Sequence, residues 1–440
     1  MHRGEHVDRL GSEPPGQEPA ARPGAGWPRR HIVVAMTFAA CVISYTDRVN
    51  ISVAIVAMKD HFGWTETEKG FVLSSFFIGY MMFMFPGGLL STRFGGRIVL
   101  GVSVLAWSVL TFLTPRAALT SFATLVAARI GMGLGEAAMF PGAFELFGHW
   151  IPVHERARAS ARMLSGIPIG TIAGLSGGGW LVAQYGWPAA FYGFGLVGLL
   201  WVLAWFPTVS NRPRSDPRVG EEERALLPPV AISSEFRAAT FRRELLRAPV
   251  AAIVGAHFAI TWSLYVLLSW LPSYFNNVQK LGIARAGLYS ALPWIAMFAS
   301  SQIAASVSDR MIKTGAPVGR TRKLMQCGSL LGTAALLLSL QHAHSALMAE
   351  ALLCVATAAL GVSFAGFAPA MLDVAPRNSA VVYGFSNMVA TLPGIIGVAV
   401  TGWLLDVTGT YAAAFALTAA VSVLGAIVFG LLFRPEPVTV

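Results

Sequence analysis

The sequence predicts an all-α integral membrane protein, with twelve transmembrane helices in two six-helix halves around a central cavity. Its 440 residues are 55% hydrophobic and only 12% charged, whereas a soluble domain carries about a quarter charged residues. Apolar windows of about 20 residues, long enough to cross a bilayer, recur along nearly the whole chain. The long polar stretch between them lies near the middle, with six windows on either side.

The windows are apolar on all sides, which favours helices over the alternating strands of a membrane barrel. We expect a disordered cytoplasmic tail over 1–30 and an N-terminal six-helix half over 31–207. A cytoplasmic linker over 208–248 then leads to a C-terminal six-helix half over 249–434 and a short cytoplasmic tail over 435–440. The twelve windows lie near 32–57, 70–91, 98–114, 119–148, 157–184, 188–207, 249–276, 286–306, 324–341, 345–372, 379–405 and 411–433.

Two internal echoes indicate that the halves are repeats. The stretch "GWLVAQYGWPAAF" (179–191) joins spans five and six, and "GWLLDVTGTYAAAF" (402–415) joins spans eleven and twelve. Likewise, "STRFGGR" (91–97) follows span two and "SDRMIKTGAPVGR" (308–320) follows span eight. Both echoes fall at matching places in a layout of six plus six spans, which favours two parallel repeats around one cavity.

The basic residues predict the orientation. With both termini placed in the cytoplasm, 25 Lys and Arg residues fall on the cytoplasmic side and 5 on the other. This asymmetry is the one expected for cytoplasmic loops. It also accounts for the net charge of +10 without any nucleic-acid partner.

Among the charges that fall within the predicted spans, we single out Asp47 and Arg48 in span one and Arg129 and Glu136 in span four. An ionised side chain at the bilayer centre costs about 2.5–3.5 kcal/mol, so such groups are expected to face the protein interior and to find partners. One interpretation is a neutral cluster that only locks span one to span four. The other is functional: the acids exchange protons, and an arginine holds an anion with its planar fork.

No enzyme site competes with this interpretation. The sequence has no phosphate-binding glycine loop followed by Lys-Ser or Lys-Thr, and its nine histidines show no metal-ligand spacing. We therefore expect neither an enzyme nor a bound cofactor or metal. His257, the one histidine inside a span, is expected to be a core residue rather than a proton relay.

Several motifs resemble the major facilitator superfamily, and within it the anion:cation symporter branch of sugar-acid transporters, sialin and vesicular glutamate transporters. The broader resemblance rests on the six-plus-six layout and "GGLLSTRFGGR" after span two. The branch resemblance rests on "YTDRVNISVA", "RIGMGLGEAAMFP", "HERARASA", "WLPSYFNNVQKLGI" and "YGFSNMVATLPGIIGVAVTGWLLDVTG". It implies cation-coupled movement of organic anions by rocking of the two halves.

The resemblance also assigns roles to residues. Its proton-linked acids fall on Asp47 and Glu136, its substrate-carboxylate arginine on Arg48, and the arginine that pairs with an acid on Arg129. The other implied positions are an aromatic lining at Tyr45 and Tyr80, an amide at Asn387, and a gating motif at Gly88, Arg93, Gly96, Arg97, Asp309 and Arg310. Simple helix packing for the tyrosines and an interhelical hydrogen bond for Asn387 are the alternatives.

The sequence departs from the family at three positions. Thr92 stands where the gating motif has an aspartate, so the cytoplasmic gate of the first half is expected to be weaker or differently paired. Met84 and Ile167 stand where sugar-acid transporters carry amides that read hydroxyls. A site that lacks hydrogen-bonding groups discriminates poorly in favour of hydroxyls, which argues against a polyhydroxylated sugar acid.

The sequence thus favours a proton-coupled symporter of small organic anions, with sodium as an alternative coupling ion. We expect a monomer in a bacterial-type inner membrane, with both termini cytoplasmic. Three alternatives remain: a same-fold anion exchanger, an aldonate or hexuronate symporter, and a non-transporting membrane receptor. An exchanger of phosphate esters needs free arginines, and the two acids are expected to offset both of them.

Overall fold

The computed structural model describes residues 27–227, 247–375 and 379–435, and these residues form helices with no strand among them. Eleven segments are long and apolar enough to cross a membrane. The remaining predicted span, the eighth, is helix α13, which has 31 residues and carries Gln302 and Ser306 on exposed positions. Helix α13 packs against the other half at α7 and α8.

The N-terminal half contains six spans, and two of them are interrupted. Helix α1 begins at Arg29, so Arg29 and Arg30 belong to the first span rather than to the tail; residues 1–26 of the predicted disordered tail lie outside the described residues. The helices are α1 (Arg29–Phe62), α2 (Glu66–Phe94), α3 (Gly96–Thr120), α4 (Phe122–Ala137), α5 (Met139–Trp150), α6 (Arg156–Leu164), α7 (Gly166–Ile172), α8 (Gly178–Tyr185) and α9 (Trp187–Thr208).

The C-terminal half has the same plan. The linker includes the short helix α10 (Glu221–Leu226), and residues 228–246 of the linker, like 376–378 and 436–440, lie outside the described residues. The helices of this half are α12 (Ala248–Asn277), α13 (Ile283–Lys313), α14 (Val318–Ser339), α15 (Ala346–Val362), α16 (Phe367–Val374), α17 (Ser379–Val389), α18 (Leu392–Thr408) and α19 (Tyr411–Leu432).

Matching irregularities confirm that the halves repeat each other. Span four breaks at Ala138, just before Pro141, and span ten breaks before α16, which contains Pro369. Proline lacks the amide hydrogen that an uninterrupted helix needs. The helices of the first predicted echo, α8 and α18, both end at a glycine with positive φ, Gly186 (81°) and Gly409 (67°). Such glycines end helices because a side chain is strained in that conformation.

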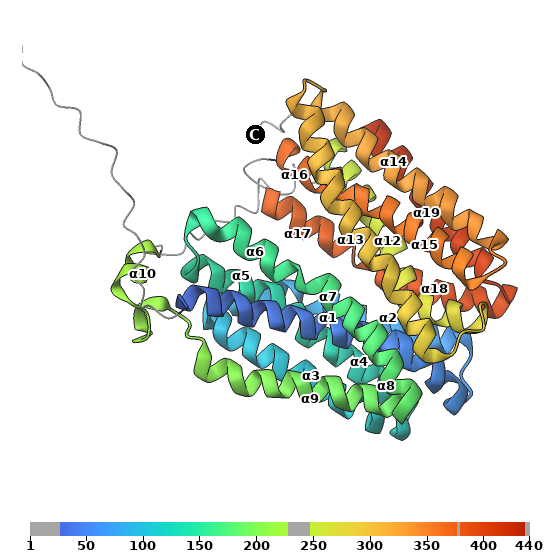
Figure 1. Cartoon of the computed structure of the whole chain (residues 1–440), viewed down its shortest axis with the longest axis horizontal. Coiled ribbons are helices and arrows are strands. Elements are labelled where there is room, and N and C mark those ends of the chain that lie inside the picture. Colours follow the sequence, from blue (N-terminus) through green and yellow to red (C-terminus); the bar gives the residue numbers. More distant parts are fainter. Residues whose placement is uncertain (1–26, 228–246, 376–378, 436–440) are drawn as a thin grey trace, which may run out of the picture.

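Among the described residues, the two halves pack against each other toward one end of the bundle. In Figure 1 the ribbons of the two halves diverge toward the end where α10 lies, which we call the linker end, and converge at the opposite end, the closed end. One hydrophobic core joins both halves at the closed end, where the ring of Phe77 of α2 contacts that of Tyr265 of α12, with 4.5 Å between ring centroids. Each half has a separate core toward the linker end.

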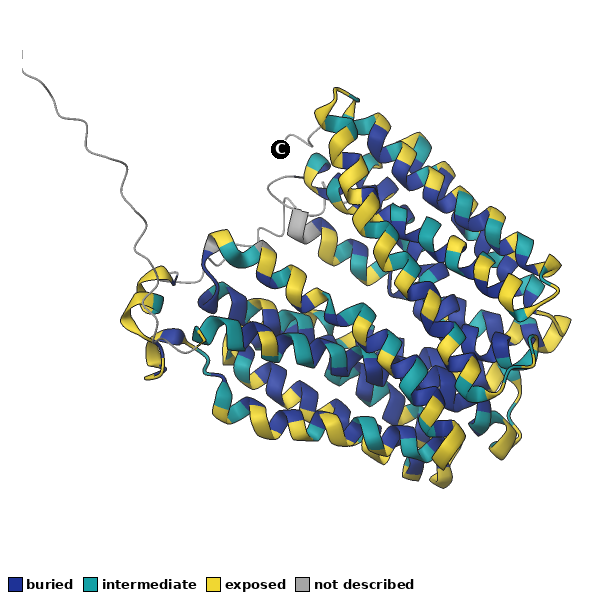
Figure 2. Cartoon of the chain, in the orientation of Figure 1, coloured by how far each residue is buried: buried dark blue, intermediate teal, exposed yellow. Residues whose placement is uncertain are grey.

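Close backbone contacts hold the closed end together. A Cβ atom added at Gly402 of α18 would lie 2.3 Å from the carbonyl oxygen of Glu66, and one added at Gly287 of α13 would lie 2.4 Å from that of Leu175. Figure 2 shows buried residues concentrated on the inner faces of the helices and where the halves meet. The described conformation is therefore sealed at the closed end.

Candidate functional site

The central pair of the candidate site joins span one to span four. Arg48 of α1 donates to Glu136 of α4, with 2.8 Å from Nη2 to Oε2 and 3.2 Å from Nε to the same oxygen. The hydroxyl of Ser44 donates to that oxygen too, at 2.9 Å. The other oxygen of Glu136, Oε1, is buried without a hydrogen-bond partner. The guanidinium therefore already holds a carboxylate in the interior of the protein.

Aromatic rings enclose the Arg48 guanidinium. Its Cζ lies 4.7 Å from the ring centroids of Tyr45 and Tyr80 and 5.0 Å from that of Phe76. Ring faces attract cations, and the attraction is stronger away from water. The two tyrosines that the sequence assigned to the lining thus lie against the predicted substrate arginine, and Phe76 completes the enclosure.

Arg129 makes its direct contacts with neutral side chains among the described residues. Glu136, seven residues along the same span, pairs with Arg48 instead, and no ion pair within 4.0 Å involves Arg129 in the described part of the chain. Its Nη1 donates to the sulfur of Met132 at 3.7 Å, and its Cζ lies 5.3 Å from the ring centroid of Phe76. Arg129 thus has no direct acid partner among the described residues in this conformation, and its pairing with an acid stays a prediction.

Asp47 also lacks a direct partner. Both of its carboxylate oxygens are buried, and neither has a hydrogen bond among the described residues. Its neighbours include Trp107 and Thr111 of α3, and the indole nitrogen of Trp107 is likewise buried and unbonded. An unpaired carboxylate is costly in the interior, and a bound proton removes that cost.

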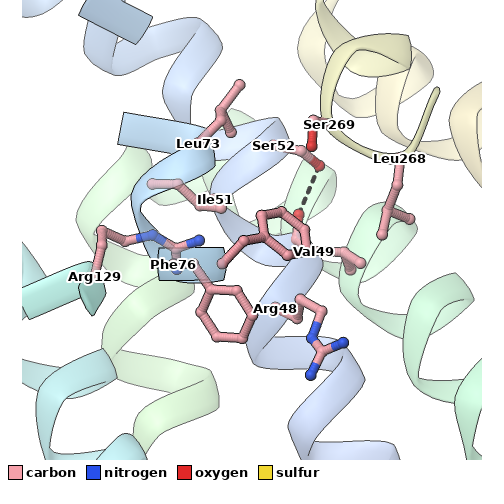
Figure 3. Close-up of a pocket in the computed structure, with 10 residues that line it drawn as sticks. Arg48, Val49, Ile51, Ser52, Leu73, Phe76, Arg129, Leu268 and Ser269 are labelled. Atoms are coloured by element: carbon pink, nitrogen blue, oxygen red, sulfur yellow. Dashed lines mark hydrogen bonds between the residues drawn. The ribbon is translucent and has the colours of Figure 1, made fainter. Parts of the chain in front are cut away.

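A small cavity lies between the two arginines and the closed end. It is lined by Arg48, Arg129, Ser52 and Ser269 together with apolar side chains, and its volume of about 10 Å³ has room for roughly one water molecule. Figure 3 shows Arg48 and Arg129 on either side of Phe76, with Ser269 and Leu268 reaching the cavity from α12. The cavity is thus too small for a carboxylic acid in this conformation.

The remaining lining predictions fall on both halves. Asn387 is half-buried on α17 beside Ser386, whose hydroxyl lies 2.8 Å from Nδ1 of His257. This bond places His257 in the buried packing of the C-terminal half, as expected for a core histidine. Met84 faces the other half, because the hydroxyl of Thr391 at the start of α18 donates to its sulfur at 3.7 Å. Ile167 packs into the separate core of the N-terminal half.

The gating motif lies at the linker end. The amide of Gly96 donates to Glu145 Oε2 at 2.6 Å, and the Arg97 guanidinium donates to the carbonyl of Phe206, also at 2.6 Å. Arg93 is exposed, and nothing lies within 4 Å of a Cβ added at Gly88. In the second copy, Asp309 and Arg310 are exposed, and neither forms an ion pair within the described residues.

Sequence reasoning missed the acids that meet these loops. Glu145 on α5 binds the start of α3, and Asp373 on α16 binds Arg322 at the start of α14 with 2.9 Å between Oδ2 and Nε. Each acid lies four residues after a proline, Pro141 or Pro369, in matching spans. This shared spacing is the signal that would have found them.

A second missed cluster closes the opposite end. Asp406 of α18 accepts hydrogen bonds from the amides of Glu66 and Thr67 at 2.9 and 2.7 Å and from the Thr67 hydroxyl at 2.5 Å. Glu66 pairs in turn with Lys59 at 2.8 Å and with buried Lys69 at 3.2 Å. These contacts tie the first turn of α2 to the other half of the molecule.

Comparison with known proteins agrees with the sequence resemblance. Residues 37–398 match the family model described as Major Facilitator Superfamily. The chain is 34% identical to "Sodium-dependent phosphate transport protein 1, chloroplastic" of Arabidopsis thaliana over 94% of this chain and 80% of that protein. It is 33% identical to "Ascorbate transporter, chloroplastic" of the same plant over 94% and 76%.

Solved structures share the fold at low sequence identity. A bacterial homologue of the human lysosomal transporter Spinster superposes with a TM-score of 0.72 at 18% identity, over 93% of this chain and 96% of that one. A D-xylose-proton symporter gives 0.70 at 16% identity, over 92% and 98%. The predicted fold and the prediction of a transporter rather than an enzyme are thereby confirmed, and the chain belongs to the Major Facilitator Superfamily.

Proposed function

We propose that this chain is a proton-coupled symporter that moves small organic anions, carboxylates in particular, by alternating access. The observation that carries the proposal is the buried Arg48–Glu136 pair. A proton on Glu136 removes the charge that holds the guanidinium, and the planar fork of Arg48 can then bind the carboxylate of a substrate. Proton binding and anion binding are thereby linked at one arginine.

Asp47 supplies the second proton site in this proposal. Its unpaired carboxylate lies in α1 next to Arg48, and Arg129 is near enough to act on it electrostatically. Ionised Asp47 and Arg129 attract each other, whereas protonated Asp47 leaves Arg129 available to an anion. Sodium remains the alternative coupling ion, and one relative carries "Sodium-dependent" in its name.

Relatives support an anion as the substrate, since their names include phosphate, ascorbate and anion transport. A dianion such as phosphate is a second candidate. The sequence argument against it assumed that two acids offset both arginines, whereas Arg129 forms no ion pair among the described residues. Arg48 and Arg129 line the same small cavity, so two guanidiniums are near one position.

Among carboxylates we propose a preference for those with few hydroxyls. Met84 and Ile167 present no hydrogen-bonding amide, and an unpaired hydroxyl costs about 1–3 kcal/mol. Two such penalties amount to roughly a hundredfold in affinity. In a competition assay, benzoate-like and simple dicarboxylic acids should outcompete galactonate and glucarate at equal concentration. The reverse order would show that the missing amides at Met84 and Ile167 do not select against hydroxyls.

We further propose that the linker end faces the cytoplasm of a bacterial-type inner membrane, on the basis of the Lys and Arg asymmetry. The relatives compared above are named as chloroplastic proteins, so the membrane itself needs a direct test. Protease accessibility of a tag at either terminus, in intact and opened vesicles, reports the orientation.

Uptake by proteoliposomes tests the function. Purified protein is offered a panel of labelled carboxylates and phosphate, with and without an inward proton gradient and with and without sodium. Accumulation of a carboxylate driven by the proton gradient supports the symporter. Uptake of phosphate alone favours the dianion candidate, gradient-independent exchange favours an exchanger, and binding without flux favours a receptor.

A further inference from the structure

An apolar groove runs along the outer face of the N-terminal half, between α2, α3 and α4. Its volume is about 390 Å³, within the range of small-molecule sites in proteins. Its lining includes two glycines one turn apart on α4, Gly131 and Gly135, and Val102 and Ala106 of α3. Val102 is 53% exposed, so the groove is open along its length to the surroundings of the protein.

Lipid is the medium around these helices, because α2, α3 and α4 are all membrane spans. An unfilled groove forfeits dispersion contacts along its lining, and an acyl chain lying in it regains them on three sides. Lipid tails are as apolar as the groove, however, so apolar contact by itself selects no particular lipid. Selection requires a polar contact at the level of the headgroup.

Such a contact is available where the groove reaches the linker end. Phe94, the last residue of α2, lines the groove, and the Cζ atom of Arg93 lies 5.4 Å from its ring centroid. Arg93 is exposed and forms no ion pair among the described residues, whereas Arg97 is turned away to the carbonyl of Phe206. A cation therefore lies beside Phe94 at the linker end of the groove.

The residue before Arg93 carries no negative charge that would offset this cation. Thr92 stands at the position where the family motif has an aspartate, and its hydroxyl donates to the carbonyl of Leu89 at 2.8 Å. An aspartate there would repel a phosphate. Glu145, an acid beside this turn, accepts from the amide of Gly96 and lies 3.0 Å from His149.

From this arrangement we propose that the groove binds one anionic glycerophospholipid. One acyl chain lies over Gly131 and Gly135, and the phosphate contacts Arg93. This lipid site is separate from the transport site at Arg48, and the proposal does not depend on which anion is transported.

Lipid retention in native mass spectrometry tests the proposal. Full-length protein is reconstituted with equal amounts of phosphatidylglycerol and phosphatidylcholine, extracted into detergent and weighed intact. The Ala106→Trp variant fills the groove, and the Ala204→Trp variant places the same side chain on an exposed position of α9 outside it. The Arg93→Gln variant removes the cation at the linker end of the groove, and Arg116→Gln removes an exposed cation at the other end of α3.

Wild-type protein should retain one phosphatidylglycerol in preference to phosphatidylcholine. Ala106→Trp should lose both lipids, and Arg93→Gln should lower the preference by about fivefold, since one such contact is worth about 1 kcal/mol. The two control variants should behave as wild type does. Equal retention by Ala106→Trp and Ala204→Trp, or an unchanged preference in Arg93→Gln, overturns the proposal. Arg93→Gln alters only an exposed side chain, so it remains informative if Ala106→Trp fails to fold.

Discussion

Arg48 is positioned by one carboxylate and three aromatic rings. The carboxylate and two of the rings come from other spans, and the third ring, that of Tyr45, lies about one turn earlier in α1. Breaking a buried ion pair by removing one partner typically costs about 3–5 kcal/mol, because the other charge is left uncompensated. Variants at this site therefore need to keep size and polarity close to those of the native residue.

Replacing the acids should uncouple transport. We expect Asp47→Asn and Glu136→Gln each to abolish proton-driven accumulation, because the amide side chain of neither variant can take up and release a proton as a carboxylate does. Counterflow exchange, which requires no net proton movement, should survive in at least one of them. Accumulation is measured in proteoliposomes with an imposed proton gradient. Normal accumulation in both variants would falsify the coupling role.

The two arginines can be separated by a charge-preserving change. Arg48→Lys keeps the charge and loses the planar fork, so the apparent affinity for a carboxylate should fall at least tenfold, as expected for loss of one charge-assisted hydrogen bond. Arg129→Lys is the matched variant in α4. If the loss of affinity follows Arg129→Lys and not Arg48→Lys, the substrate contact lies at Arg129.

Elements outside the membrane spans tie the linker to the N-terminal half. Glu223 of α10 accepts from the amides of Arg29 and Arg30 at the start of α1, both at 2.9 Å. Arg218 donates to Asp216 in the same linker and lowers the pKa of that carboxyl to about 2. A hydrogen bond from Arg30 likewise lowers the pKa of Glu155.

These lowered pKa values predict that the linker is not a pH sensor. A carboxyl whose pKa is lowered on folding stabilises the fold at pH values above its ordinary pKa, which is 3.8 for Asp216. That effect is lost only as the pH falls toward the lowered pKa of about 2. We therefore expect Asp216→Asn to lower thermal stability and to leave the pH profile of transport between about pH 5 and 8 unchanged. Melting curves and uptake at several pH values check this, and a shifted transport profile would contradict it.

At the scale of the whole molecule, the two halves share one hydrophobic core at the closed end, whereas each half has a core of its own toward the linker end. Asp406 binds the first turn of α2 across this interface, where a carboxylate also interacts favourably with the helix dipole. Alternating access requires these contacts to break as the linker end closes.

We call the hydrogen bonds from the first turn of α2 to Asp406 the closed-end latch. Weakening this latch should shift the molecule toward the conformation in which the closed end is open. With the three native cysteines replaced, Ser273→Cys reports opening, because Ser273 is fully buried near the closed end. Loss of about 1 kcal/mol in Asp406→Asn should raise maleimide labelling of that cysteine about fivefold. Asp60→Asn, an exposed acid at the same end, is the control. Equal labelling in the two variants would argue against a latch.

The sequence allowed the span count, the repeat and the central charges to be predicted, because hydropathy and charge cost act on each span separately. Pairing was harder: Arg129 and Glu136 share a span, but Arg48 reaches Glu136 from α1, and the choice depends on helix rotation and depth. Asp406 was not recognised because two of its three donors are backbone amides of α2, which leave no trace in side-chain identities.

The seal at the closed end also decides how the protein can be inhibited. In the described conformation the route to Arg48 from the closed end is blocked by the packed core around Phe77 and Tyr265. A bulky anion that wedges between the separate cores would prevent the halves from rocking, and it can arrive only from the compartment that the linker end faces. Such a blocker should act on one side of the membrane, so vesicles of opposite orientation would differ in their sensitivity to it.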